Sequence, residues 1–77
     1  MGRKPVPRPG FLDTCDYLGY IDGDRRWRNS RGTLLYTWDG LHGEVEVFNT
    51  RGEHQGVVDA MTGRPVKPAR KGRKIRV

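Results

Sequence analysis

Three carboxylates and one histidine lie close together near the middle of the chain, as Asp39, His42, Glu44 and Glu46. Buried charge is costly unless it is paired, so a strand of the core would not hold this set. A generic surface loop has no need of so many titratable groups. Carboxylates and imidazole are common general acids and bases of enzymes, and the stretch is therefore a candidate site of acid–base catalysis.

RNA is a substrate for which such groups suffice, because its 2′-hydroxyl is a built-in nucleophile. A base takes the 2′-OH proton, an acid protonates the leaving 5′-oxygen, and a cation offsets the charge on the phosphorane. A glutamate is the expected base, His42 the expected acid and an arginine the expected cation. Asp39 would orient His42, since a carboxylate beside a histidine favours the charged imidazole that an acid needs.

Spacing alone does not bring these groups together. In a regular strand His42 and Glu46 would lie roughly 13 Å apart, at about 3.3 Å per residue. A bend or bulge at Gly40 or Gly43 would shorten that gap. Two other interpretations stay open at this point. One is a cluster of surface ion pairs, which imitates catalytic clusters; the other is a metal site formed by Asp39 and its three neighbours, although no standard ligand spacing is present.

The elements that must position these groups are predicted to be short strands, because eleven glycines and five prolines argue against long helices. The fold class is mainly β (α+β with little helix): a small, highly twisted antiparallel β-sheet with a short N-terminal helical turn, one packed face and one wet face. The expected strands are 33–39, 44–49, 53–59, 65–67 and an edge strand at 71–77, and a helical turn followed by a short strand is expected within 11–21.

The net charge favours a polyanionic partner. The 77 residues, enough for one domain, carry a formal net charge of +6, which suits nucleic acid, an acidic protein or an anionic membrane surface. Residues 34–59 hold five acids and one base, whereas residues 60–77 hold seven bases and no acid. An acidic centre with a basic tail is unusual for a plain RNA-binding domain, where the acids would repel phosphate.

Arginines beside a tryptophan indicate a surface for nucleic acid, because guanidinium grips phosphate and indole can stack on a base. Trp27 itself is expected in the core, since tryptophan is highly buried on average. The expected RNA-binding cations are Arg25, Arg26 and Arg28 around Trp27, and Lys71, Lys74 and Arg76 in the tail.

The N-terminal residues, the cysteine count and the lengths of the apolar runs further limit the possible structures and partners. Residues 1–10 are basic and hold three prolines, which predicts a flexible basic arm that is either a tail without function or a contact for phosphate. The lone Cys15 excludes an internal disulfide and a zinc site made of cysteines. No apolar run is long enough for a signal peptide or a membrane span, so no membrane partner is expected.

The motifs together closely resemble the C-terminal cytotoxic ribonuclease domain of the ribosome-inactivating colicins and cloacin. The resemblance spans about residues 25–77, and its most specific part is the Trp-Asp-x-x-His-Gly-Glu-x-Glu run. The residues that carry it are Arg26-Trp27, Gly32, Tyr36-x-Trp38-Asp39-x-x-His42-Gly43-Glu44-x-Glu46, Gly52-x-His54-x-Gly56, Asp59 and Thr62-Gly63.

That resemblance implies a metal-independent endoribonuclease toxin that cuts small-subunit ribosomal RNA at the decoding centre and blocks translation. It implies a twisted antiparallel sheet with a short N-terminal helix, and no cofactor. It places the essential aspartate at Asp39, the acid at His42 and the base at Glu46. The family's C-terminal arginine corresponds to Arg73, or to Arg70 if a gap follows Thr62-Gly63, and Glu44 matches a further acidic position.

The resemblance also implies partners and a place of action. The substrate would be the ribosome, and a small acidic immunity or antitoxin protein would be the inhibitor, which the charge of +6 fits. Residues 11–77 would be the ribonuclease domain. The turn at 50–52 is one residue shorter than in the family, and the N-terminal third does not match. A freestanding toxin, a delivered effector and an excised domain all remain open, acting in the bacterial cytoplasm after secretion or delivery.

A rival hypothesis is a non-catalytic basic module that binds RNA or the ribosome through its arginines and its tail, with strongly salt-dependent affinity. It predicts that the acids are dispensable. A third hypothesis is a metal-dependent nuclease, which EDTA would silence.

Overall fold

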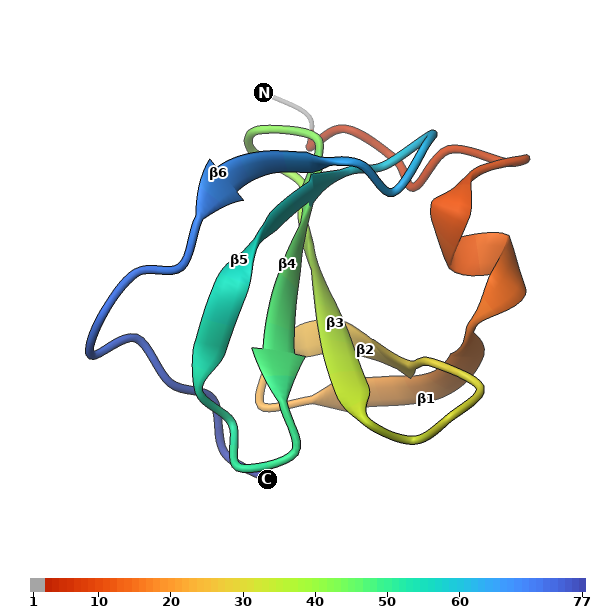
Figure 1. Ribbon diagram of the computed structural model, residues 1–77. Coiled ribbons are helices and arrows are strands. Elements are labelled where there is room, and N and C mark those ends of the chain that lie inside the picture. Colours follow the sequence, from red (N-terminus) through yellow and green to blue (C-terminus); the bar gives the residue numbers. More distant parts are fainter. Residues whose placement is uncertain (1–2) are drawn as a thin grey trace.

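One antiparallel sheet of six strands forms the body of the computed structural model, which describes residues 3–77. Its spatial order follows the chain, β1-β2-β3-β4-β5-β6, so every connection joins neighbouring strands (Figure 1). A single 3₁₀ turn, η1, precedes β1. The bounds are η1 Phe11–Thr14, β1 Asp16–Ile21, β2 Asp24–Arg28, β3 Leu34–Asp39, β4 Glu44–Asn49, β5 His54–Asp59 and β6 Pro65–Pro68.

The predicted fold class is confirmed, with the turn-then-strand order at residues 11–21 and the strands near 33–39, 44–49, 53–59 and 65–67. The structure adds β2, which the sequence did not single out as a strand. The predicted edge strand at 71–77 is wrong. The amide of Arg73 donates to the carbonyl of Arg70 at 3.2 Å, and Gly72 has a φ of +85°, so a turn interrupts the run. Only an isolated bridge between Glu53 and Lys74 remains.

One face of the sheet carries the main core. Trp27, Tyr36, Val45 and Val47 alternate along β2, β3 and β4 and are buried, as period-two patterning requires. The prediction that Trp27 is a core residue is confirmed. The 3₁₀ turn closes this side, because the ring of Phe11 meets Tyr36 edge-on with centroids 5.3 Å apart.

The opposite face is not uniformly exposed to solvent, contrary to the prediction of one packed and one wet face. Phe48 has no exposed surface, and His54 is 7% exposed. The C-terminal segment, residues 69–77, crosses this face: the amide of His54 donates to the carbonyl of Arg73, and the amide of Ile75 to that of Gly52. A Cβ at Gly52 would collide with the carbonyl of Ile75, so the glycine permits this approach.

The described part of the arm lies along the sheet. The amide of Lys4 donates to the carbonyl of Gly40 at 2.8 Å, and the indole of Trp38 donates to the carbonyl of Lys4 at 2.9 Å. Val6 packs against the core. Figure 1 shows this segment passing the β3–β4 turn. Residues 1 and 2 lie outside the described part, and the flexibility of residues 1–10 stays a prediction, because contacts do not measure mobility.

Residues 3–77 contain no helix with the length and apolar character that crossing a membrane requires.

Candidate active site

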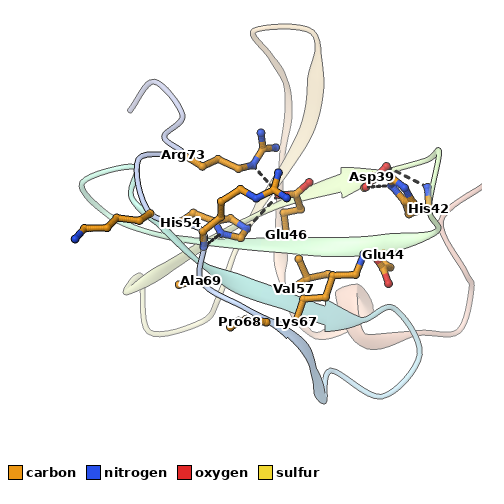
Figure 2. Close-up of a pocket in the computed structure, with 12 residues that line it drawn as sticks. Asp39, His42, Glu44, Glu46, His54, Val57, Lys67, Pro68, Ala69 and Arg73 are labelled. Atoms are coloured by element: carbon orange, nitrogen blue, oxygen red, sulfur yellow. Dashed lines mark hydrogen bonds and ion pairs between the residues drawn. The ribbon is translucent and has the colours of Figure 1, made fainter.

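A cleft of about 680 Å³ opens on the face of the sheet that the C-terminal segment crosses (Figure 2). Seven of the predicted site residues line this cleft. Six of them are all the residues predicted for the active site, and the seventh, Lys71, is one of the predicted RNA-binding cations. Its lining residues are Asp39, His42, Glu44, Glu46, His54, Val57, Lys67, Pro68, Ala69, Arg70, Lys71 and Arg73.

The β3–β4 turn provides the Asp39–His42 pair. Asp39 and Glu44 are paired across the two strands, and the amide of Gly43 donates to the carbonyl of Asp39 at 2.7 Å, which closes the turn. Gly43 has a φ of +70°, a conformation that favours glycine. A hairpin turn, rather than a bulge, therefore brings His42 into the same cleft as Glu46.

Asp39 holds both the turn and the imidazole. Its Oδ1 accepts hydrogen bonds from the amides of Leu41 and His42, each at 3.1 Å, and its Oδ2 lies 2.7 Å from Nδ1 of His42. Burial alone would raise the pKa of Asp39, but these hydrogen bonds outweigh it, and the pKa lies below its usual value. Because Nδ1 is held by the carboxylate, Nε2 of the half-exposed His42 is the nitrogen left for a substrate.

Glu46 lies in the middle of the cleft, on β4. Its Oε1 accepts a hydrogen bond from Nε of Arg73 at 2.8 Å and lies 3.1 Å from Nε2 of His54. Within residues 3–77 both of these contacts use Oε1, so Oε2 is available to take a proton. Figure 2 shows Glu46 between the Arg73 and His54 side chains on one side and the Asp39–His42 pair on the other.

His54 is a site residue that the sequence reasoning missed. Its Nδ1 accepts a hydrogen bond from the amide of Arg70 at 2.8 Å, so the proton of the neutral ring is on Nε2, toward Glu46. The Nε2–Oε1 contact is an ion-pair distance that lacks the alignment of a good hydrogen bond. Burial lowers the pKa of His54, Glu46 opposes this shift, and the cations of Arg73 and Arg70 add to it. His54 is therefore a neutral, buried support for Glu46.

A signal for His54 was present in the Gly52-x-His54-x-Gly56 pattern. A Cβ at Gly56 would lie 2.9 Å from the carbonyl of Lys67, and Gly52 meets the C-terminal segment. His54 thus lies between two glycines against which other backbone segments pack, and this close packing is what buries it. The ring of His54 packs edge-on against Phe48 with centroids 5.2 Å apart, which fixes its orientation.

The two candidate arginines have different positions. Arg73 points its guanidinium at Glu46 and lies 5.8 Å from the centroid of Phe48. Arg70 also lines the cleft, but its contact with the cluster is made by its main-chain amide. Of the two, Arg73 is therefore the one whose guanidinium contacts Glu46.

The acidic edge of the cleft is partly neutralised. Glu44 accepts a hydrogen bond from Nζ of Lys67 at 2.9 Å, and both side chains are accessible. Lys67 was not among the predicted site residues. Four cations, Lys67, Arg70, Lys71 and Arg73, line the cleft together with three carboxylates.

The other predicted RNA-binding cations lie outside the cleft. Arg25 stacks on Tyr17 and Trp27, at 5.2 and 5.3 Å from the ring centroids. Arg26 is 5% exposed, and its Nη1 donates to the carbonyl of Arg76, so it anchors the C-terminal segment and has little surface to offer RNA. Their RNA contacts stay predictions, as do those of three exposed cations, Arg28, Lys74 and Arg76.

A metal site was one of the open interpretations. Among residues 3–77, no three histidine, cysteine, aspartate or glutamate side chains gather closely enough to hold a metal ion. The four central residues instead divide into an Asp39–His42 pair, a Glu44–Lys67 pair and the Glu46 cluster.

Comparisons with known proteins find similar sequences. A family model described as Cytotoxic matches residues 21–76. Colicin E3 of Escherichia coli is 37% identical over 62 residues, which are 78% of this chain and 11% of that protein. Cloacin of Escherichia coli is 42% identical over 43 residues, which are 54% of this chain and 8% of that protein. The chain thus spans only a small part of the length of the curated relatives it matches.

Proposed function

Because the chain belongs to the Cytotoxic family, we propose that it is a toxin endoribonuclease that cuts small-subunit ribosomal RNA at the decoding centre and stops translation. The observation that carries this proposal is the single cleft in which Glu46, Arg73 and the Asp39–His42 pair meet. A surface ion-pair cluster has no need of a cleft, and it has no need of a carboxylate oxygen left free beside a held imidazole.

The proposed reaction is an attack by the 2′-hydroxyl on the neighbouring phosphate. Oε2 of Glu46 takes the 2′-OH proton, the 2′-oxygen bonds to phosphorus, and the bond to the 5′-oxygen breaks. Nε2–H of His42 gives its proton to that oxygen. Arg73, which lies against Glu46, stabilises the charge on the phosphorane. The products are a 2′,3′-cyclic phosphate and a 5′-hydroxyl.

The remaining cleft residues position these groups. Asp39 directs Nε2 of His42 toward the substrate by holding Nδ1. His54, neutral and buried, supports Oε1 of Glu46 without adding a second charge. This scheme needs no metal ion, because the nucleophile belongs to the substrate and the acid and base are side chains.

The inhibitor proposed for this chain is a small acidic immunity or antitoxin protein. Cations line the cleft, and others, such as Arg28 and Arg76, are exposed outside it. An acidic partner would associate rapidly with such a surface, and the rate would fall with added salt. The proposed place of action is the cytoplasm of a bacterial target cell, reached by delivery within a larger toxin or by secretion.

The experiment that tests the proposed function is the incubation of intact bacterial ribosomes with the protein in EDTA, followed by mapping of new RNA ends. One cut at the decoding centre is the expected result. Binding without a cut would favour the non-catalytic RNA-binding module. A cut that EDTA abolishes would favour a metal-dependent nuclease.

A further inference from the structure

A second cavity of about 260 Å³ lies outside the catalytic cleft, between residues 3–6, the β1–β2 turn and Trp38 of β3. The N-terminal arm forms one of its walls. Three cations line it against one carboxylate, and two aromatic rings complete it. These residues are Arg3, Lys4, Arg25, Asp24, Tyr20 and Trp38.

The arm touches the turn that carries His42. A Cβ at Gly40 would lie 2.9 Å from Cβ of Arg3, and one at Gly43 would lie 2.8 Å from Cδ and 3.6 Å from Nζ of Lys4. Nζ of Lys4 is therefore beside the residue that directly follows His42. The main chain of Lys4 fixes this position through Gly40 and Trp38, which leaves the side chain free for another role.

The chemistry of the cavity suits one unit of a nucleic acid strand. Ammonium and guanidinium groups bind phosphate, and aromatic rings stack on bases. Tyr20 is 72% exposed, so its ring is accessible for stacking on a base. The volume is below the about 300–1,000 Å³ of pockets that enclose drug-sized ligands, so it suits about one nucleotide rather than a folded element.

The proposed reaction gives the bound strand a direction. Glu46 faces the 2′-hydroxyl of the nucleotide on the 5′ side of the cut, and His42 faces the oxygen of the nucleotide on the 3′ side. A strand that continues past His42 in the 3′ direction would therefore reach the arm, whose Arg3 and Lys4 lie against Gly40 and Gly43 of the same turn.

We propose that Arg3, Lys4 and the second cavity bind the RNA on the 3′ side of the scissile bond. This inference rests on the proposed function. The family model begins at residue 21, so the arm lies outside the matched region.

The kinetic test compares two charge-matched double variants on ribosomes over a range of salt concentrations. Arg3→Gln/Lys4→Gln removes the two side-chain cations and keeps the main-chain contacts. Arg31→Gln/Arg51→Gln removes two exposed cations placed in neither cavity. We expect the first variant to lose about tenfold or more in kcat/KM, with a salt slope lower by about one to two units, and the second to retain the wild-type slope.

The direction is tested by cross-linking. A photoreactive amino acid is placed at position 4 in the His42→Ala variant, which slows cleavage so that most of the RNA stays uncut during cross-linking. In a second sample of that variant it is placed at position 71, because Lys71 lies in the segment that contacts Glu46. Cross-links to ribosomal RNA are mapped by reverse transcription. We expect position 4 to mark nucleotides 3′ of the cut made by the wild type, and position 71 to mark nucleotides 5′ of it.

The outcomes separate the two levels of the proposal. Equal losses in the two double variants would overturn the role of the arm. Cross-links from position 4 on the 5′ side, or none when position 71 gives them, would overturn the direction. A wild-type protein that leaves ribosomes intact would instead overturn the proposed function, and this inference with it.

Discussion

The two ends of the cleft are built in different ways. At one end Asp39 and His42 belong to one turn, and their contact is local and accessible to solvent. At the other end Glu46, His54 and Arg73 come from three segments, and the side chain of His54 is only 3% exposed. A local pair can be changed at small cost to the fold, whereas a buried cluster couples activity to stability.

The largest expected effect is on cleavage. His42→Ala and Glu46→Ala should each reduce the rate of ribosome cleavage by about 10²-fold or more, because each removes one partner of the proposed proton transfer. Single-turnover cleavage of ribosomes measures this loss. Asp16→Asn, at an exposed carboxylate far from the cleft, is the matched control and should cut like the wild type. Rapid cutting by both site variants would refute the assigned roles.

The two arginines of the C-terminal segment should differ. Arg73→Ala removes the guanidinium beside Glu46 and should cost about 10²–10³-fold in kcat, as the loss of a donor to a developing charge does elsewhere. Arg70→Ala keeps the main-chain amide that holds His54 and should cost far less. Equal losses for the two variants would contradict the distinction between a guanidinium in the cluster and one beside it.

Substitutions at the buried end of the cleft should lower the stability of the fold. His54→Ala leaves a cavity and an unpaired amide at Arg70, and should lower the free energy of unfolding by about 2–4 kcal/mol. His54→Asn keeps an acceptor for that amide and should lose less. His42→Ala, at the exposed end, should change stability by about 0.5 kcal/mol or less. Denaturant unfolding measures all three, and similar losses at positions 42 and 54 would remove the contrast between the ends.

The pH dependence of stability should also distinguish the ends. The pKa of His54 lies below its ordinary value of 6.5, so the unfolded chain binds a proton before the folded one. The stability from neutral His54 is complete above about pH 6.5 and is lost as the pH falls below it. Asp39, whose pKa is also lowered, loses its contribution only below its ordinary 3.8. The unfolding midpoint of the wild type should decrease as the pH is lowered from about 7.5 to 5, and that of His54→Asn should decrease less. If the two plots of midpoint against pH were parallel, the neutral state of His54 would be contradicted.

The smallest effect on stability is expected at the acidic edge of the cleft, where Glu44 pairs with Lys67. Lys67→Gln breaks an accessible pair with Glu44, and should change the free energy of unfolding by about 0–1 kcal/mol. A loss comparable to that of His54→Ala would show that this pair belongs to the buried cluster.

The sequence was sufficient for the local features. Period-two alternation around Tyr36, Val45 and Val47 predicted the strands and the core face, because neighbouring side chains of a strand point to opposite faces. The contact of Asp39 with His42, three residues apart, was also predicted, although the hairpin turn that holds them was not. These features depend on residues a few positions apart, which is why patterning predicts them.

The rest depends on contacts between distant residues. Patterning predicted an edge strand at 71–77, but the turn at Gly72 and the contacts of Arg73 with β4 and β5 make this segment a cover over Phe48 instead. The role of His54 follows from that cover, since the amide of Arg70 determines its tautomer. The glycines beside His54 indicate that other backbone packs closely there, but nothing local identifies Arg70 as its partner. In the same way, nothing local to Lys67 identifies Glu44 as its partner.

The most direct test of the central claim is the chemistry of the RNA ends that the wild-type protein makes on ribosomes in EDTA. Attack by the 2′-hydroxyl predicts a 2′,3′-cyclic phosphate on the upstream fragment and a 5′-hydroxyl on the downstream one, with both formed about 10²-fold or more slowly by Glu46→Ala. A 5′-phosphate and a free 3′-hydroxyl would show that water is the nucleophile, and would contradict the roles of Glu46 as the base and His42 as the acid.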